Sequence, residues 1–249
     1  MNARTLRWSH FAAPARFDRL AARLVPWCGA VAALLAVAGL FVGFVVAPTD
    51  AVQGEAYRII YVHVPTAWMS MIVYAAMAFW AAVGLVFNAR LASVLAVSLA
   101  PTGALMTFLA LWTGALWGKP TWGAWWVWDA RLTSELLLLF LYLGFMALHG
   151  AIEDKRRADR AAGLLAIVGV VNLPVIYFSV QWWNTLHQGA SVTLNKPPSM
   201  AAPMLAGMVL MALAAWAYCI AVALARARLE LREREAHTAW AQRSMEVGS

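Results

Sequence analysis

The chain has 249 residues, of which 63% are hydrophobic and only 12% are charged. Globular domains keep about a quarter of their residues charged to cover their surface, so this composition excludes a water-soluble fold. The mean hydropathy of +0.68 indicates a membrane protein instead. The net charge of +7 comes from basic residues scattered between apolar runs, which argues against a nucleic-acid partner and favours contact with membrane lipid. Cys28 and Cys219 form neither a CxxC nor a CxxCH pattern, which excludes a disulfide framework and a thiol redox motif.

Apolar runs long enough to cross a bilayer recur along the whole chain. A spanning helix needs roughly 20 mainly apolar residues. Six windows meet this condition, at residues 27–47, 64–87, 91–117, 132–152, 161–183 and 200–225. The sequence therefore predicts an all-α, polytopic integral membrane bundle of six helices that forms a single domain over residues 1–249. No small-residue cleavage site follows the first run, which indicates a retained anchor, although the Arg-rich residues 1–23 also allow a transit peptide.

The basic residues predict the orientation of this bundle. Fifteen of the 19 Lys and Arg residues fall in the N-terminal segment, the second and fourth loops and the C-terminal tail. The other three loops hold Arg58, Lys119, Arg131 and Lys196. Because short loops rich in Lys and Arg stay in the cytoplasm, we expect both termini inside and the first, third and fifth loops outside.

The histidines separate by side under this topology. His10, His149 and His237 belong to the cytoplasmic side, whereas His63 and His187 face outward in the first and fifth loop regions. A single outward His is usually a polar residue hydrogen-bonded at the headgroup level. Two on one face weaken that interpretation, because a pair of imidazoles can bind one metal ion.

The third loop, which faces outward and is expected over residues 118–131, contains Trp122, Trp125, Trp126 and Trp128. Interfacial tryptophans commonly form an aromatic belt, but four within seven positions exceed what a belt requires. Trp122 and Trp126 share a face if the segment is helical, whereas Trp126 and Trp128 share one if it is extended. Either arrangement predicts an aromatic shelf beside the two histidines.

A flat aromatic shelf with two imidazoles is suited to haem. The macrocycle stacks on indole and its iron accepts neutral imidazole nitrogens. The propionates need cations, and Arg binds carboxylates in a bidentate manner. Arg58 precedes His63 by five residues and Arg131 follows the tryptophans, so both are candidates, with a lipid phosphate contact as the alternative for each.

The segment from Trp122 to Asp129 reads W-G-x-x-W-x-W-D. It resembles the tryptophan-rich signature of the haem-handling membrane proteins of cytochrome c maturation. Six spans, with the signature between the third and fourth and one outward His on each side, resemble the CcmC family in particular. The larger CcmF and CcsA-type relatives carry more spans and additional intramembrane histidines. The resemblance covers essentially the whole chain.

This resemblance implies a site, partners and a location. His63 and His187 correspond to the two axial ligands of the haem iron, and haem b is held transiently and non-covalently on the periplasmic face of the bacterial inner membrane. The implied partners are the CcmA and CcmB ABC transporter, CcmD and the haem chaperone CcmE, which receives the haem. The signature positions that the resemblance assigns to haem binding are Trp122, Gly123, Trp125, Trp126, Trp128 and Asp129.

Other functions are less compatible with the residues. We expect no enzymatic activity, and the lack of a Walker A sequence means that ATP-driven work needs a partner. A haem-translocating subunit is the alternative, but it needs a polar interior. A cytochrome b-type electron carrier needs ligands on both sides, and a purely structural subunit leaves the tryptophans unexplained. Few polar residues lie within the spans, chiefly Thr102, Thr107, Ser134, Glu135, Asn172 and Ser179.

Asp129 has two possible roles that the sequence leaves open. Its carboxylate can cap the N-terminus of the fourth span, where backbone N–H groups lack partners. It can instead orient Arg131. The position immediately before the apolar run favours the cap.

Overall fold

The computed structural model describes residues 13–189, 192 and 199–246 of the chain. Two residues discussed above, His10 and Lys196, lie outside this part. Within it, no β-strand is present, and six helical segments are long and apolar enough to cross a membrane. The predicted all-helical six-span fold is therefore confirmed. The six segments are Pro14–Val46, Glu55–Phe87, Arg90–Trp122, Ala130–Ala151, Lys155–Trp182 and Ala202–Arg234.

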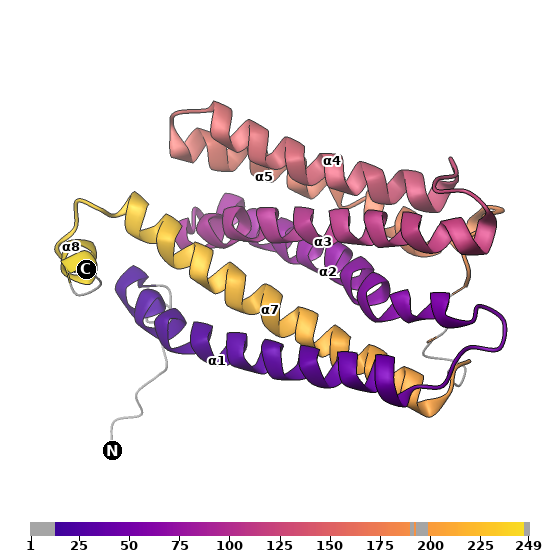
Figure 1. Ribbon diagram of the computed structural model, residues 1–249. Helices are drawn as coiled ribbons and strands as arrows, with labels where there is room; N and C mark the ends of the chain where they lie inside the picture. The colour runs from indigo at the N-terminus through magenta and orange to yellow at the C-terminus, as the bar shows by residue number, and fades with distance from the viewer. Residues whose placement is uncertain (1–12, 190–191, 193–198, 247–249) are drawn as a thin grey trace, which may run out of the picture.

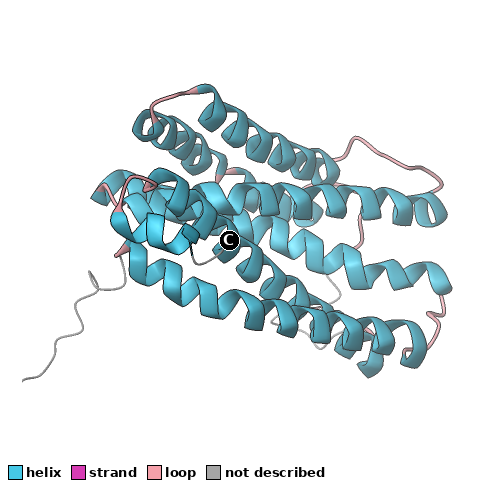
Figure 2. Cartoon of the chain, turned by 60° about the vertical axis from the view of Figure 1, so that its left-hand side comes forward, coloured by secondary structure: helices cyan, strands magenta, loops and turns pink. Residues whose placement is uncertain are grey.

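The long helices run roughly along one axis and pack in neighbouring pairs (Figure 1). Figure 2 shows that the connections between them lie at the two ends of the bundle. The described termini lie at one end, called the terminal end below, and the link from α3 to α4 lies at the other. The direction in which the bundle crosses the membrane stays a prediction from the basic residues. The pairs are α1 (Pro14–Phe41) with α7 (Ala202–Arg234), α2 (Ile60–Phe87) with α3 (Arg90–Trp122), and α4 (Ala130–Ala151) with α5 (Lys155–Gly169).

The centre of the bundle joins α2 to α4 through buried polar and aromatic groups. Tyr74 and Tyr142 are fully buried and meet edge to face with ring centroids 5.0 Å apart. The Tyr142 hydroxyl donates to the Ser70 carbonyl oxygen at 2.8 Å. Since lipid supplies no competing hydrogen bonds, polar links of this kind hold helices together inside a membrane.

The fifth predicted span consists of two helices. α5 ends at Gly169 and α6 (Asn172–Trp182) begins after a short turn. Pro174 lies in the first turn of α6, where a missing backbone N–H costs no intrahelical hydrogen bond. The Asn172 side chain donates to the Ser134 carbonyl oxygen at 2.9 Å, which fixes the start of α6 against α4.

The third predicted loop is shorter than expected, because α3 continues through Trp122. Gly123 ends the helix in the left-handed conformation, with φ of 78°, and its N–H donates to the Lys119 carbonyl oxygen at 3.1 Å. The expected loop over 118–131 is therefore wrong at both ends: α4 already begins at Ala130, so the non-helical segment is 123–129. Trp122 belongs to a helix, whereas Trp125, Trp126 and Trp128 follow it.

Ion pairs connect the helices at the terminal end. Asp18 of α1 accepts from Arg228 at 3.1 Å and Arg232 at 3.0 Å, which ties α1 to α7. His149 of α4 contacts Asp159 of α5 at 3.1 Å, and Asp159 pairs with Arg234 of α7 at 2.7 Å. His149 therefore has a structural role, and Arg234 near the end of α7 takes part in packing the helices together.

Candidate functional site

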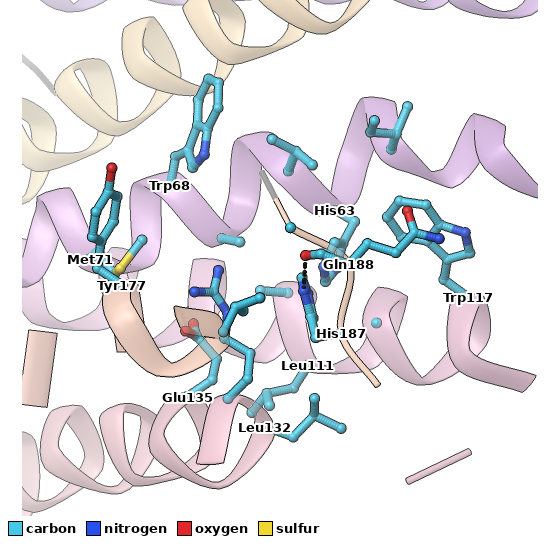
Figure 3. A pocket seen from close by; sticks show the side chains of 18 of the residues that line it. His63, Trp68, Met71, Leu111, Trp117, Leu132, Glu135, Tyr177, His187 and Gln188 are labelled. Carbon is cyan, nitrogen blue, oxygen red and sulfur yellow. Dashed lines mark hydrogen bonds between the residues drawn. The ribbon is translucent and has the colours of Figure 1, made fainter. Parts of the chain in front are cut away.

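A cavity of about 290 Å³ opens among the helices at the end opposite the terminal end. Its walls come from α2, α3, α4, α6, the segment after α6 and Met208 of α7. Figure 3 shows His63 and His187 side by side in it, with Trp117 near them and Glu135 further along. The sequence-predicted site residues that line the cavity are His63, Trp122, Arg131 and His187.

His63 lies in the first turn of α2 and is oriented by α3. Its Nδ1 is 3.1 Å from Thr113 Oγ1, and the Thr113 hydroxyl donates to the Leu109 carbonyl oxygen at 2.6 Å. Because that hydroxyl proton is already used, Thr113 Oγ1 accepts the proton of Nδ1–H, and the lone pair of Nε2 stays free. Trp117 meets the imidazole edge to face at 5.5 Å, and a Cβ on Gly114 would lie 3.0 Å from His63 Cε1. The absence of a side chain at Gly114 therefore lets α3 approach the ring.

His187 lies in the segment that follows α6. Its ring centroid is 6.3 Å from that of His63 and 6.2 Å from that of Trp122. The Nδ1 atom is 2.8 Å from the Gln188 carbonyl oxygen, which can only accept, so Nδ1 carries the proton and Nε2 again stays free. Burial, aided by the charge of Arg131, lowers the pKa of His187 and keeps the ring neutral. Two imidazoles whose Nε2 atoms have no hydrogen-bond partner within the described part of the chain thus meet in one cavity.

Two sets of hydrogen bonds hold the His187 segment. The Thr185 hydroxyl donates to Asp129 Oδ2, and the His187 backbone N–H donates to Thr185 Oγ1 at 3.1 Å. On the other side, Gln53 donates to Gln188 Oε1 at 3.2 Å and accepts from Trp117 Nε1 at 2.7 Å. The segment that carries His187 is therefore linked to the Trp-rich loop and to the loop before α2.

The N-terminal cap of α4 resolves the two roles considered for Asp129. Asp129 Oδ1 accepts from the Leu132 backbone N–H at 2.8 Å, so the cap is confirmed. Arg131 is directed elsewhere, since its guanidinium donates to the Ile176 carbonyl oxygen of α6. Asp129 and Arg131 thus act on different partners.

Glu135 is a cavity residue that the sequence did not assign to the site. It follows Arg131 by about one turn of α4, its exposed fraction is 6%, and it accepts from Ser70 Oγ at 2.7 Å. The signal that identifies it is a carboxyl group within a membrane span, because such groups are rare and usually functional. Thr113 and Thr185 gave no such signal, since hydroxyl residues are common in spans and loops.

Of the four signature tryptophans, Trp122 is the one that lines the cavity among the described residues. It lies at the end of α3. Trp126 and Trp128 lie 5.4 Å apart at 75° in the non-helical segment, which matches the extended arrangement considered above. Trp125 is 55% exposed and Trp128 is 78% exposed, whereas Trp126 Nε1 is buried without a hydrogen-bond partner among the described residues. Haem contacts for Trp125, Trp126 and Trp128 stay predictions.

Arg58 is not among the cavity-lining residues. It pairs with Glu55 and donates to the Gly43 carbonyl oxygen and, at 3.3 Å, to that of Ala47. These carbonyl oxygens end the first span, where a π-helical turn over Val42–Val46 leaves backbone groups to satisfy. The geometry gives Arg58 a capping role, and its predicted propionate contact stays a prediction.

The sequence matches the CcmC family, described as heme exporter protein C, over residues 7–242. The chain belongs to this family. It is 51% identical over 205 residues to the heme exporter protein C of Haemophilus influenzae, covering 82% of this chain and 83% of the relative. It is 50% identical over 194 residues to the Escherichia coli protein of the same name, covering 78% of this chain and 79% of the relative. A ccmC-like mitochondrial protein of Marchantia polymorpha, whose name refers to cytochrome c biosynthesis, is 44% identical over 175 residues, covering 70% of this chain and 72% of the relative.

Proposed function

We propose that this chain handles haem for cytochrome c maturation by holding haem b between His63 and His187 and presenting it to an acceptor. Haem is a transient, non-covalent cargo in this proposal. Membership of the heme exporter protein C family supports the haem-handling role. The scatter of basic residues supports a haem site on the periplasmic face of the bacterial inner membrane.

The observation that supports the proposal most directly is the distance between the rings of His63 and His187. Metal–imidazole bonds are about 2 Å long, so two axial imidazoles on one iron have ring centres on the order of 6 Å apart. The centroids of His63 and His187 are 6.3 Å apart, and each Nδ1–H already has an acceptor. Metal-binding histidines usually donate their other ring N–H in this way.

The remaining lining of the cavity fits the other parts of haem. Arg131 supplies a guanidinium for a propionate, and Trp122 supplies an indole face for the macrocycle. We propose that Trp125, Trp126 and Trp128 contact the haem where it extends beyond the cavity, with Gly123 ending α3 so that the chain can turn towards them. Val64 and Met71 add apolar walls.

Partners complete the proposed function. Since the sequence lacks a Walker A motif, ATP-dependent work belongs to the CcmA and CcmB transporter, with CcmD as a small membrane partner and CcmE as the haem acceptor. The alternative is a haem-translocating subunit. The α2 residues that line the cavity run from Ile60 to Met71, about 16 Å of helix, which is roughly half of the ~30 Å hydrocarbon core. A cavity of that depth favours presentation over passage.

An absorption spectrum of the purified protein tests the proposal. We expect protein from haem-replete cells to retain a Soret band and a six-coordinate, low-spin iron. Colourless preparations, or unchanged spectra in both His63→Ala and His187→Ala, would contradict it. Transfer of haem to purified CcmE, followed as covalent haem on the chaperone, tests the presentation step.

A further inference from the structure

The carboxylate of Asp129 joins the start of α4 to the segment that carries His187. We propose that Asp129, acting through Thr185, is the positioning residue that holds His187 at the iron. This inference rests on the proposed function, because it concerns the position of one of the two proposed ligands. It gives the Asp of the tryptophan-rich signature a role beyond capping a helix.

The geometry consists of three hydrogen bonds in series, called the Asp129–Thr185 link below. Oδ1 of Asp129 accepts from Leu132 N at 2.8 Å, which fixes the carboxylate to the first turn of α4. Oδ2 accepts from the Thr185 hydroxyl, and Thr185 Oγ1 accepts from the His187 backbone N–H at 3.1 Å. The link therefore reaches the main chain of the ligand residue itself.

The chemistry of each group restricts what can replace it. A hydroxyl has one proton and free lone pairs, so Thr185 donates to the carboxylate and accepts from the amide at the same time. A carboxylate has two oxygens, so Asp129 caps α4 and holds Thr185 together. The hydrogen bond from the hydroxyl to the ionised carboxylate is charge-assisted and stronger than a neutral one.

The second connection to this segment is weaker. Gln53 and Gln188 form a neutral hydrogen bond at 3.2 Å between exposed side chains, where water competes for both partners. His63, by contrast, is held by the continuous backbone of α2. Loss of the Asp129–Thr185 link is thus expected to free His187 while His63 and the cavity stay in place.

Thr185→Val tests the link, because it keeps the side-chain shape and removes the hydroxyl. We expect roughly tenfold to hundredfold weaker His187 ligation, seen as conversion to a five-coordinate spectrum that added imidazole restores. Thr185→Ser should keep the wild-type spectrum. Thr133→Val makes the same change on the exposed face of the first turn of α4 and is the matched control.

Asp129→Asn separates the link from the cap. Asn is as good an N-cap as Asp, so α4 should keep its start while the charge-assisted bond is lost. The double variant Asp129→Asn/Thr185→Val should be no worse than either single variant, because both remove one link. Additive effects would overturn the inference, as would a wild-type spectrum in Thr185→Val.

Hydrogen–deuterium exchange of the haem-free protein measures the strength of the link independently of haem binding. The amide of His187 should exchange at least tenfold faster in Thr185→Val than in wild type or Thr133→Val. Unchanged exchange would overturn the inference while leaving the proposed function intact. If the wild-type protein binds no haem but Thr185→Val still shows the faster exchange, the proposed function would be refuted and the structural link would be kept.

Discussion

The two histidines of the cavity lie close together but are held by different kinds of structure. His63 belongs to α2, and its ring is set by Thr113 and Trp117 of the neighbouring helix α3. His187 belongs to a non-helical segment whose position depends on the hydrogen bond that Thr185 donates to Asp129 and the one that Gln188 accepts from Gln53. Displacing His63 requires two packed helices to move apart, whereas displacing His187 requires only a few hydrogen bonds to break.

This difference suits the proposed transfer of haem to an acceptor. A ligand carried by a rigid helix keeps haem in the cavity, and a ligand carried by a loop can leave first. We therefore expect His187 to be displaced before His63 when haem passes to the chaperone.

The two alanine variants should behave unequally. His63→Ala removes the ligand on the rigid side, so we expect purified protein to lose nearly all of its haem. His187→Ala should retain haem in a five-coordinate form that exogenous imidazole converts back to low spin. Haem content per protein and the absorption spectrum measure both effects. The reverse pattern, with more haem left in His63→Ala, would contradict the asymmetry.

Thr113→Val tests the rigid side through its hydrogen bond. The change removes the acceptor for His63 Nδ1–H at nearly constant volume. Because such outer partners are typically worth about 10- to 100-fold in metal affinity, haem dissociation should accelerate by a similar factor. Thr107→Val is the control, since the Thr107 hydroxyl is also buried in α3 but, among the described residues, donates to the Gly103 carbonyl oxygen of its own helix and contacts no histidine. Equal dissociation rates in the two variants would argue that Thr113 has no orienting role.

Arg131→Lys keeps the charge and removes the planar fork. If Arg131 binds a propionate, haem retention should fall roughly tenfold, because Lys cannot reproduce a bidentate bond. Arg58→Lys is the comparison, since Arg58 does not line the cavity. Competitive haem extraction by apomyoglobin measures retention. A larger loss of haem retention in Arg58→Lys than in Arg131→Lys would indicate that Arg58 belongs to the haem site.

The signature tryptophans should show the smallest and most graded effects. Trp122→Leu removes the indole beside His187 inside the cavity and should weaken haem retention a few-fold, in line with roughly 1 kcal/mol for an aromatic contact. Trp128→Leu changes an exposed ring and should leave retention nearly unchanged while slowing transfer to the chaperone. Identical behaviour of the two variants in both assays would remove the distinction between them.

Part of the site is readable from sequence because rare residues occur at fixed places. His63, His187 and the W-G-x-x-W-x-W-D run stand out against six apolar spans, and the bundle brings both histidines into one cavity. No comparable feature of the sequence predicted that Arg58 and Arg131 would lie in different environments. Both are basic residues near the same end, and only the tertiary contacts show that Arg58 binds the carbonyl oxygens that end the first span.

The six spans follow from the amino-acid sequence alone, because every crossing of the hydrocarbon core needs a long apolar run whatever it packs against. The family also follows from the sequence, through the tryptophan-rich signature. The tertiary structure alone decided which side chains reach the cavity. That outcome depends on where α3 stops, on the turn that separates α5 from α6, and on the link from Asp129 to Thr185. Each of these sets the direction of side chains through contacts between segments far apart in the chain. A local sequence pattern does not encode such contacts.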